Sequence, residues 1–227
     1  MHTEPQSTPQ PLGPVRCARA WVVLLTVALV GLVADLATKS IAFATVAPSP
    51  VLVKREDVLA VASPSLLIEA HEPVVVIPRV LEFTLVLNPG AVFGIGAGQR
   101  VVFIIFTCFA MGFAMYMFAK WTVARDWSSH AALGMLISGG VGNLYDRLRF
   151  ACVRDFIHPL PDAVLPFGWE FPWGGRVIWP YVSNVADLLL IIGVAMLVWR
   201  ALRPHKAGRA KPGTVALSST RPDHPGG

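Results

Sequence analysis

Two aspartates beside membrane-length apolar runs near the end of the chain are the residues best placed to do chemistry. Asp155 lies in the stretch V-R-D-F, and Asp187 lies in N-V-A-D at the start of the apolar run 188–199. An ionisable carboxyl in or at the edge of a membrane segment is costly, so it is a functional candidate by default. Paired carboxylates that share one proton activate water in aspartic proteolysis. The pair therefore indicates an aspartic hydrolase site.

A second interpretation of the two aspartates stays open at this point, because each carboxylate could instead form an ion pair with an arginine. Four arginines are near enough in the chain to serve, namely Arg147, Arg149, Arg154 and Arg176. In that case the carboxylates would neutralise structural charges and would carry no chemistry.

A polar group also ends the glycine-rich run 139–147. Asn143, Asp146 and Arg147 fall at i, i+3 and i+4, so they line one face of a helix. One interpretation is a structural cluster that anchors the helix at the membrane interface. The other is a substrate-facing wall in which Asn143 and Arg147 donate hydrogen bonds to a peptide backbone. The residues alone do not separate the two.

Two further motifs lie earlier in the chain. The segment N-P-G at 88–90 is a strong turn signal, and beyond a plain turn it offers the Asn88 amide to a site outside the membrane. Asp35 and Lys39 are four residues apart on a long apolar segment, where they are expected to neutralise each other.

Composition places the chain among membrane proteins. It has 227 residues, of which 54% are hydrophobic and only 15% charged, whereas soluble domains carry about 25% charged residues. The mean hydropathy is +0.58. The net charge of +5 gathers in the two tails and one short loop, a pattern of membrane topology rather than of nucleic-acid binding. The three cysteines show no CxxC spacing and no cluster with histidine, so neither a metal nor a cofactor is expected.

Four segments are expected to be transmembrane helices, over residues 20–46, 101–121, 131–148 and 184–202. The third is rich in glycine, which lets neighbouring helices approach closely. Between the first two lies a proline-rich insert at about 47–99, with a short helix expected over 58–70 and strands over 74–77 and 80–87. The fold class is therefore mainly α, with a small extracytoplasmic β-rich element.

Basic residues flank the start of the first helix, the loop between the second and third, and the end of the fourth. The positive-inside rule places all of these in the cytoplasm, together with both termini. Asp155 and Asp187 then lie at the outer ends of their helices, at the same membrane depth. Residues 1–19 and 203–227 are expected to be disordered cytoplasmic tails around a membrane domain at 20–202.

These motifs together resemble lipoprotein signal peptidase (signal peptidase II), a bacterial family of membrane aspartic proteases. Five blocks occur in the family's order: D-x-x-T-K at 35–39, N-x-G-A-x-F at 88–93, G-G-x-x-G-N-x-x-D-R ending at 147, V-x-D-F at 153–156 and N-x-A-D at 184–187. The resemblance covers about residues 20–202. Each block is weak alone, but five in order on this topology are specific.

The resemblance implies that Asp155 and Asp187 form the catalytic dyad. It implies substrate contacts by Asn88, Asn143, Arg147 and Asn184, and supporting roles for Asp35, Lys39, Gly90 and Asp146. The implied reaction removes the signal peptide of a lipid-modified prolipoprotein just before its lipidated cysteine, in the bacterial inner membrane. Membrane lipids are implied partners, and so are peptide antibiotics of the kind that inhibit the family.

The chain departs from the family pattern in places that do not touch the dyad. Ala151 stands where glycine is usual, Ser183 stands where phenylalanine is usual, and the stretches 47–78 and 158–180 are longer than expected. The alternative to a peptidase is a non-catalytic four-span scaffold or transporter subunit. A transporter usually shows internal repeats and helix breaks near mid-membrane, and neither is evident.

Overall fold

Four long helices form the body of the computed structural model, which describes residues 13–90, 100–172 and 174–203. They are α1 (Ala18–Thr45), α3 (Arg100–Trp121), α4 (Trp127–Phe150) and α5 (Val185–Leu202). Helix α4 packs against each of the other three, so it is the centre of the bundle. Of the tails expected at 1–19 and 203–227, residues 1–12 and 204–227 lie outside the described residues, whereas residues 13–19 contain a 3-10 turn and the start of α1.

Three of these helices are long and apolar enough to cross a membrane, namely α1, α3 and α5. The sequence predicted a fourth span over 131–148, and α4 does form a helix there that is longer at both ends. Its polar residues are tolerated because its neighbours cover them: Ser138, Asn143 and Asp146 are all buried. A helix enclosed by other helices does not need an apolar surface of its own.

The glycines of α4 let its neighbours come close. A Cβ at Gly139 would lie 2.5 Å from the carbonyl oxygen of Ala186 in α5, and one at Gly134 would lie 2.7 Å from that of Leu24 in α1. Only glycine allows backbones to pack at this distance. The glycine-rich run therefore brings α1 and α5 onto α4, as the sequence predicted.

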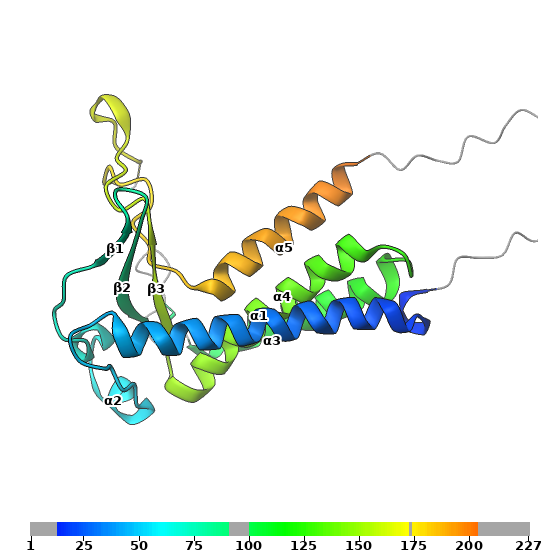
Figure 1. Ribbon diagram of the computed structural model, residues 1–227, viewed down its shortest axis with the longest axis horizontal. Coiled ribbons are helices and arrows are strands. Elements are labelled where there is room, and N and C mark those ends of the chain that lie inside the picture. The colour runs from blue at the N-terminus through cyan, green and yellow to red at the C-terminus, as the bar shows by residue number, and fades with distance from the viewer. Residues whose placement is uncertain (1–12, 91–99, 173, 204–227) are drawn as a thin grey trace, which may run out of the picture.

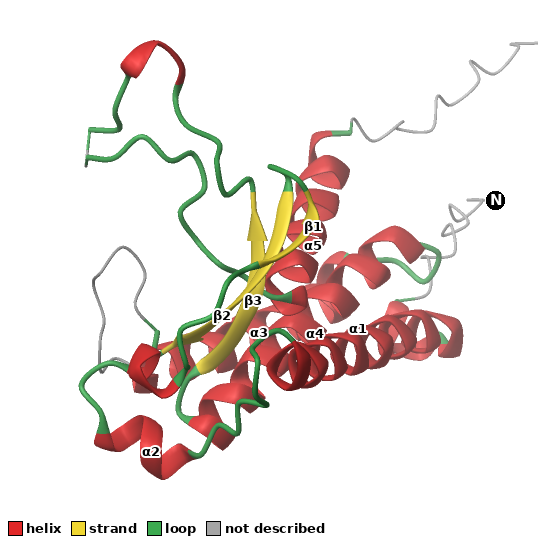
Figure 2. Ribbon diagram, turned by 60° about the vertical axis from the view of Figure 1, so that its left-hand side comes forward, coloured by secondary structure: helices red, strands yellow, loops and turns green. Residues whose placement is uncertain are grey.

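A three-stranded antiparallel sheet stands at one end of the bundle, in the order β1 (Val74–Ile77), β2 (Leu81–Asn88) and β3 (Val153–Pro159) (Figure 2). The two strands predicted in the insert are confirmed. The third strand was missed, because Asp155 was assigned to the outer end of a helix. In the structure the chain leaves α4 through Ala151 and pairs Asp155 with Val86 of β2.

The short helix expected over 58–70 is wrong in its bounds. The chain instead forms α2 (Arg55–Ala60) and a separate 3-10 turn, η2 (Pro64–Leu67). Pro64 lacks an amide hydrogen and its ring clashes with the preceding turn, so it starts the second element instead of continuing the first. Two other 3-10 turns are η1 (Pro14–Arg16) and η3 (Pro166–Gly168).

Apolar packing is divided between the two ends of the molecule. One buried cluster joins the end of α1 to the sheet and includes Phe43, Leu85 and Phe156. The other holds the opposite ends of α1, α3 and α4 together around Leu24 and Phe118. Much of the remaining helix surface is apolar and exposed, which suits contact with lipid.

Candidate active site

Strand β3 and the first turn of α5 carry the two aspartates. Asp155 is the third residue of β3 and is only 2% exposed, whereas Asp187 lies in the first turn of α5 and is half-buried. The backbones of Ile157 and Ser183 bond to each other in both directions at 2.8 Å. This bridge fixes the strand beside the segment that leads into α5.

The start of α5 is a capping box formed by Asn184 and Asp187. The Asn184 side chain accepts a hydrogen bond of 3.0 Å from the Asp187 backbone amide, and Asp187 Oδ2 accepts one of 3.3 Å from the Asn184 amide. This reciprocal arrangement satisfies amides that a helix otherwise leaves free at its first turn. It also fixes which way the Asp187 carboxylate points.

Two asparagine side chains connect the aspartates. Asn184 Nδ2 donates a bond of 2.5 Å to Asp155 Oδ1 and one of 3.2 Å to Asn143 Oδ1. Asn143 Nδ2 in turn donates a bond of 2.8 Å to Asp187 Oδ1. The sequence-predicted residues from β3, α4 and α5 therefore meet in one continuous hydrogen-bonded chain.

Asn88 at the end of β2 contacts the same carboxylate from the other side. Its Nδ2 donates a bond of 3.1 Å to Asp155 Oδ2, while its Oδ1 accepts one of 2.9 Å from the Gly90 amide. Gly90 has φ = 102°, a conformation that glycine adopts without steric cost. The N-P-G segment is thus both a turn and a contact to the site, so the two interpretations of Asn88 are compatible.

A buried lysine, Lys39, forms a hydrogen bond to one of these asparagines. Lys39 Nζ lies 2.8 Å from Asp35 Oδ2, as their i, i+4 spacing predicts, and donates a bond of 2.9 Å to Asn143 Oδ1. It is also 3.5 Å from Asp146 Oδ2, and all three charged side chains are fully buried. The free oxygen of Asp35 accepts a bond of 2.8 Å from the Ala186 amide, which ties α1 to the start of α5.

Asp146 holds the residue that precedes Asp155. Its carboxylate accepts hydrogen bonds from the Arg154 backbone amide at 3.0 Å and from Arg154 Nη2 at 2.9 Å. The guanidinium of Arg154 also lies over the Phe150 ring, 4.5 Å from its centroid. Asp146 thus fixes the start of β3 relative to α4, a partnership that the sequence spacing did not suggest.

Neither aspartate forms an ion pair with an arginine within the described residues, so the structural interpretation of the two carboxylates loses its basis. Burial, together with the negative charge of Asp187, raises the pKa of Asp155 from 3.8 to about 7. Hydrogen bonds from Asn184 and Asn88 and the charge of Lys39 act in the opposite direction. Near neutral pH Asp155 can therefore hold a proton.

The nearby thiol is not a competing nucleophile. Cys152 is fully buried, and that burial, with the charge of Asp146, raises its pKa to about 12. A thiol needs to lose its proton to attack a carbonyl. Cys152 therefore packs in the core and does not serve as a nucleophile.

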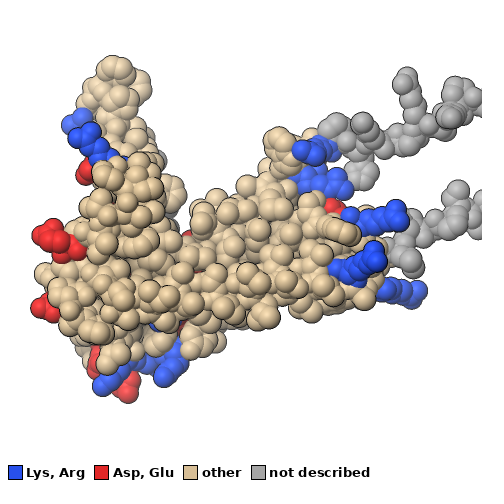
Figure 3. Space-filling model, in the orientation of Figure 1, with Lys and Arg blue, Asp and Glu red and all other residues tan. Residues whose placement is uncertain are grey.

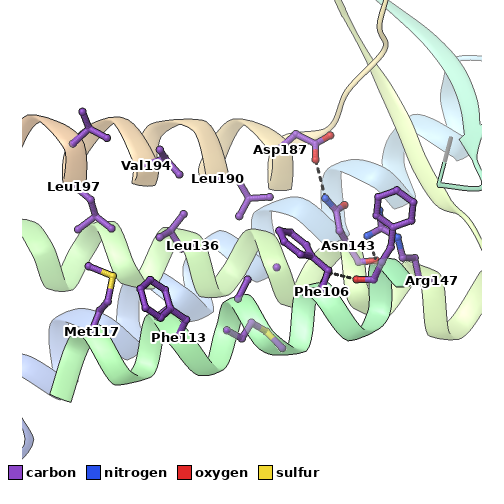
Figure 4. A pocket seen from close by; sticks show the side chains of 17 residues that line it. Phe106, Phe113, Met117, Leu136, Asn143, Arg147, Asp187, Leu190, Val194 and Leu197 are labelled. Atoms are coloured by element: carbon purple, nitrogen blue, oxygen red, sulfur yellow. Dashed lines mark hydrogen bonds between the residues drawn. The ribbon is translucent and has the colours of Figure 1, made fainter. Parts of the chain in front are cut away.

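A cavity of about 500 Å³ opens from Asp187 and runs between α3, α4 and α5 (Figure 4). Its polar end is formed by Asp187, Asn143 and Arg147, which lie close together in the figure. The rest of the wall is apolar, with residues such as Phe113, Leu136 and Val194. This shape suits a long apolar ligand whose polar end reaches the carboxylate.

Arg147 lies at the mouth of this cavity with unused hydrogen-bonding capacity. Its Nη1 donates to the Asn143 carbonyl oxygen at 3.3 Å, and its guanidinium lies 5.2 Å from the centroid of Phe103. Among the described residues, its buried Nε has no hydrogen-bond partner. Buried donors are rarely left unpaired, so this one is suited to bind a ligand carbonyl.

Sequence reasoning missed the apolar wall of the cavity, since helix residues that face a cavity and those that face lipid have the same composition.

Ala151, which the sequence analysis noted as an alanine in place of the usual glycine, lies at the end of α4. Ala151 caps α4 with φ = 64°, a left-handed conformation that glycine adopts more easily. The alanine is therefore the left-handed residue that ends α4.

Comparison with known proteins gives one consistent result. Residues 27–203 match the family model described as Signal peptidase (SPase) II. A lipoprotein signal peptidase of Desulfitobacterium hafniense (strain DSM 10664 / DCB-2) is 34% identical over 130 residues, which are 56% of this chain and 72% of the relative. One of Streptococcus pyogenes serotype M2 is 37% identical over 122 residues, covering 54% of this chain and 69% of the relative.

Two solved structures share the fold. Both are described as bacterial membrane enzyme structures determined by the in meso method, at 2.3 and 1.9 Å resolution. The first has a TM-score of 0.55 and 22% identity, and covers 90% of this chain and 98% of its own. The second has a TM-score of 0.54 and 23% identity, and covers 86% of this chain and 99% of its own.

Proposed function

This chain belongs to the signal peptidase II family, and from that premise we propose that it is an aspartic endopeptidase with Asp155 and Asp187 as its catalytic dyad. It removes the signal peptides of lipoproteins, as the names of its relatives indicate. The observation that carries the assignment of the dyad is the chain of hydrogen bonds from Asp155 through Asn184 and Asn143 to Asp187. It connects a carboxyl group on β3 with one on α5, and the second of these, Asp187, lines the polar end of an apolar cavity.

The proposed reaction uses the different surroundings of the two carboxyl groups. Asp187 is half-buried and ionised, and takes a proton from a water molecule that attacks the scissile carbonyl carbon. Asp155 is enclosed and protonated, and donates a hydrogen bond to the carbonyl oxygen. The tetrahedral intermediate collapses when Asp187 returns its proton to the leaving amine nitrogen.

The substrate follows from the cavity. A prolipoprotein carries its acyl chains on the cysteine just after the scissile bond, and the apolar cavity between α3, α4 and α5 suits those chains. Asn143 and Arg147 line the polar end of the cavity, and Asn88 contacts Asp155. All three are proposed to donate hydrogen bonds to the extended peptide backbone. Asn184 contacts Asp155 directly, so it positions the dyad and lies within reach of the peptide as well.

The supporting residues hold this arrangement rigid. Asp35, Lys39 and Asp146 form the buried charged cluster beneath Asn143, and Gly90 allows the turn that directs Asn88 to Asp155. None of these four is proposed to touch the substrate.

We place four helices across the bacterial inner membrane, with α4 as the fourth span enclosed by the other three. At the end of the bundle where α1 begins and α5 ends, Figure 3 shows Lys and Arg with little acidic charge, whereas the opposite end carries both Lys or Arg and Asp or Glu. The positive-inside rule makes the end where α1 begins cytoplasmic, with both termini on the same side. The sheet and the dyad then lie at the outer side of the membrane. Both belong to the proposed membrane domain at 20–202. Membrane lipids and peptide inhibitors of the family are further proposed partners.

The test is cleavage of a purified, lipid-modified prolipoprotein, followed by its change in gel mobility. Asp155→Asn and Asp187→Asn are each expected to lose activity by about 100-fold or more, which is the contribution usual for a positioned acid or base. Asp162→Asn is the matched control, since Asp162 is exposed in the loop after β3. Undiminished cleavage by either dyad variant would contradict the assignment, and inactivity of the unaltered protein would favour a non-catalytic scaffold.

A further inference from the structure

The segment between β3 and α5 forms an aromatic hairpin, defined here as residues 160–181 without Trp173, which lies outside the described residues. Its two arms pair through an antiparallel bridge between Val164 and Val177. Hydrogen bonds from Leu165 N to Arg176 O at 2.8 Å and from Ile178 N to Ala163 O at 2.7 Å close the ladder. The hairpin is therefore an ordered projection with the turn η3 near its tip.

The tip exposes large aromatic side chains. Phe167 is 89% exposed and Trp169 is 66% exposed, and their ring centroids are 6.1 Å apart. Phe167 has φ = 59°, an uncommon conformation for a bulky residue. A hairpin that met only water would not be expected to keep both rings outside and hold one of them on a strained backbone. The rings therefore indicate a surface that is covered in the working protein.

The direction of the hairpin shows what can cover it. In Figures 1 and 2 it extends sideways from the outer end of the bundle, across the direction of α1, instead of continuing along it. If the helices cross a membrane, the hairpin must run along the membrane surface. Only three residues, 182–184, separate it from the start of α5, so its base is fixed at the membrane.

The level of the hairpin matches the headgroup region of the bilayer. Helix α1 has 28 residues, or about 42 Å at 1.5 Å per residue, while the hydrocarbon core is about 30 Å thick. The outer turns of α1 therefore stand among the headgroups, and Figure 1 places the hairpin at that same end of the bundle. Trp and Tyr prefer this region, because one part of each ring system is apolar and another can hydrogen-bond.

Charge does not oppose this placement. The hairpin carries only Asp162, Glu170 and Arg176 among its residues, and its outermost part in Figure 3 shows no charged side chain on the face drawn. A cavity of about 510 Å³ lies along one arm, walled by Val177, Ile178 and Trp179 among others. An apolar tip with a hollow beside it can accommodate parts of lipid molecules.

We propose that the aromatic hairpin is a lateral membrane anchor, whose tip residues Phe167 and Trp169 insert among the lipid headgroups of the outer leaflet beside α5. It would fix the tilt of the sheet, and so of Asp155, relative to the membrane surface from which the substrate approaches. The inference rests on the membrane placement proposed above and does not depend on the peptidase reaction.

The experiment uses the full chain in lipid vesicles. The emission spectrum of Trp169→Phe is subtracted from that of the unaltered protein, which leaves the fluorescence of Trp169. Lipids brominated close to their ester groups quench tryptophans at the headgroup level, and iodide quenches those in water. We expect the Trp169 emission to be blue-shifted, to be lost with brominated lipid and to be protected from iodide. The substitution is conservative at an exposed site, so the variant retains the fold.

Trp199 near the far end of α5 is the internal control, read in the same way through Trp199→Phe. It is 63% exposed on the helix surface and stacks with Arg203 at 5.0 Å. Quenching of Trp199 by brominated lipid combined with free access of iodide to Trp169 would overturn the anchor and leave the membrane placement intact. Absence of lipid quenching at both positions would overturn the membrane placement, and the anchor with it.

Discussion

Lys39 and Asn143 lie 104 positions apart in the chain, yet the Lys39 ammonium donates a hydrogen bond of 2.9 Å to the Asn143 amide oxygen. That oxygen also accepts a bond from Asn184, so both of its acceptor positions are used. The amide nitrogen of Asn143 must then face Asp187, to which it donates. A buried charge on α1 thus determines how the Asn143 side chain on α4 meets Asp187.

We predict that Lys39→Met destabilises the protein by about 3–5 kcal/mol, because it leaves Asp35 buried without its counter-ion. Thermal unfolding in detergent at fixed protein concentration measures the change. The double variant Asp35→Asn with Lys39→Met removes both charges and is expected to recover part of the loss. A double variant no more stable than Lys39→Met alone would show that the two charges do not depend on each other.

Stability is predicted to fall as pH rises from about 4 to about 7. The pKa of Asp155 is raised from 3.8 to about 7 by burial and by the charge of Asp187, so the folded chain holds this proton more tightly than the unfolded chain. The stabilising contribution is complete below pH 3.8 and is lost as pH rises through 7. Each pH unit changes the free energy of unfolding by at most about 1.4 kcal/mol.

Asp155→Asn provides the comparison for this prediction, since the amide does not titrate. The difference in unfolding temperature between the unaltered protein and this variant should change over the interval between pH 4 and 7. A constant difference would contradict a raised pKa.

Peptidase activity has its own predicted pH dependence. The proposed reaction needs a protonated Asp155, so kcat/KM should decline above about pH 7 as that proton is lost. A pH profile with a short lipidated substrate checks this. A rate that stays constant well above pH 7 would assign the proton to another group.

Much of the site could be predicted because its residues act over short sequence distances. The i, i+4 pair of Asp35 and Lys39 and the turn at Gly90 follow from local rules that hold in most folds. The same holds for the helices, which follow from apolar length, and for the two strands of the insert. The expectation of four spans rested on these rules as well, and three helices satisfy them on their own.

Other contacts depend on the tertiary fold, so rules about residues close in sequence do not predict them. β3 pairs with β2 across about seventy residues, so its short run 153–159 gave no strand signal beside the helix before it. The Asp146–Arg154 pair exists only because the chain reverses at Ala151. The apolar cavity arises from three helices at once, and no single helix encodes it.

The close approach of α4 and α5 leads to a prediction about Gly139. A Cβ there would lie 2.5 Å from the Ala186 carbonyl oxygen, which is backbone and cannot turn aside. We expect Gly139→Ala to lower stability by about 1–3 kcal/mol and to displace the first turn of α5 that carries Asp187. Gly112→Ala in α3 is the matched control, because nothing lies within 4 Å of its Cβ position. Equal unfolding temperatures for the two variants would contradict the close packing.

A variant at Arg147 can distinguish substrate binding from the chemical step. The buried Nε of Arg147 has no partner within the part of the chain that the structure describes. A peptide carbonyl at the cavity mouth would therefore gain a hydrogen bond from a charged donor, worth about 1.5–3 kcal/mol. Arg147→Gln should therefore lower kcat/KM by about 10- to 100-fold, chiefly through a higher KM. Arg149→Gln is the control, since Arg149 is exposed two residues later on the same helix. A loss confined to kcat would instead place Arg147 in stabilising the transition state, and no loss would remove it from the substrate site.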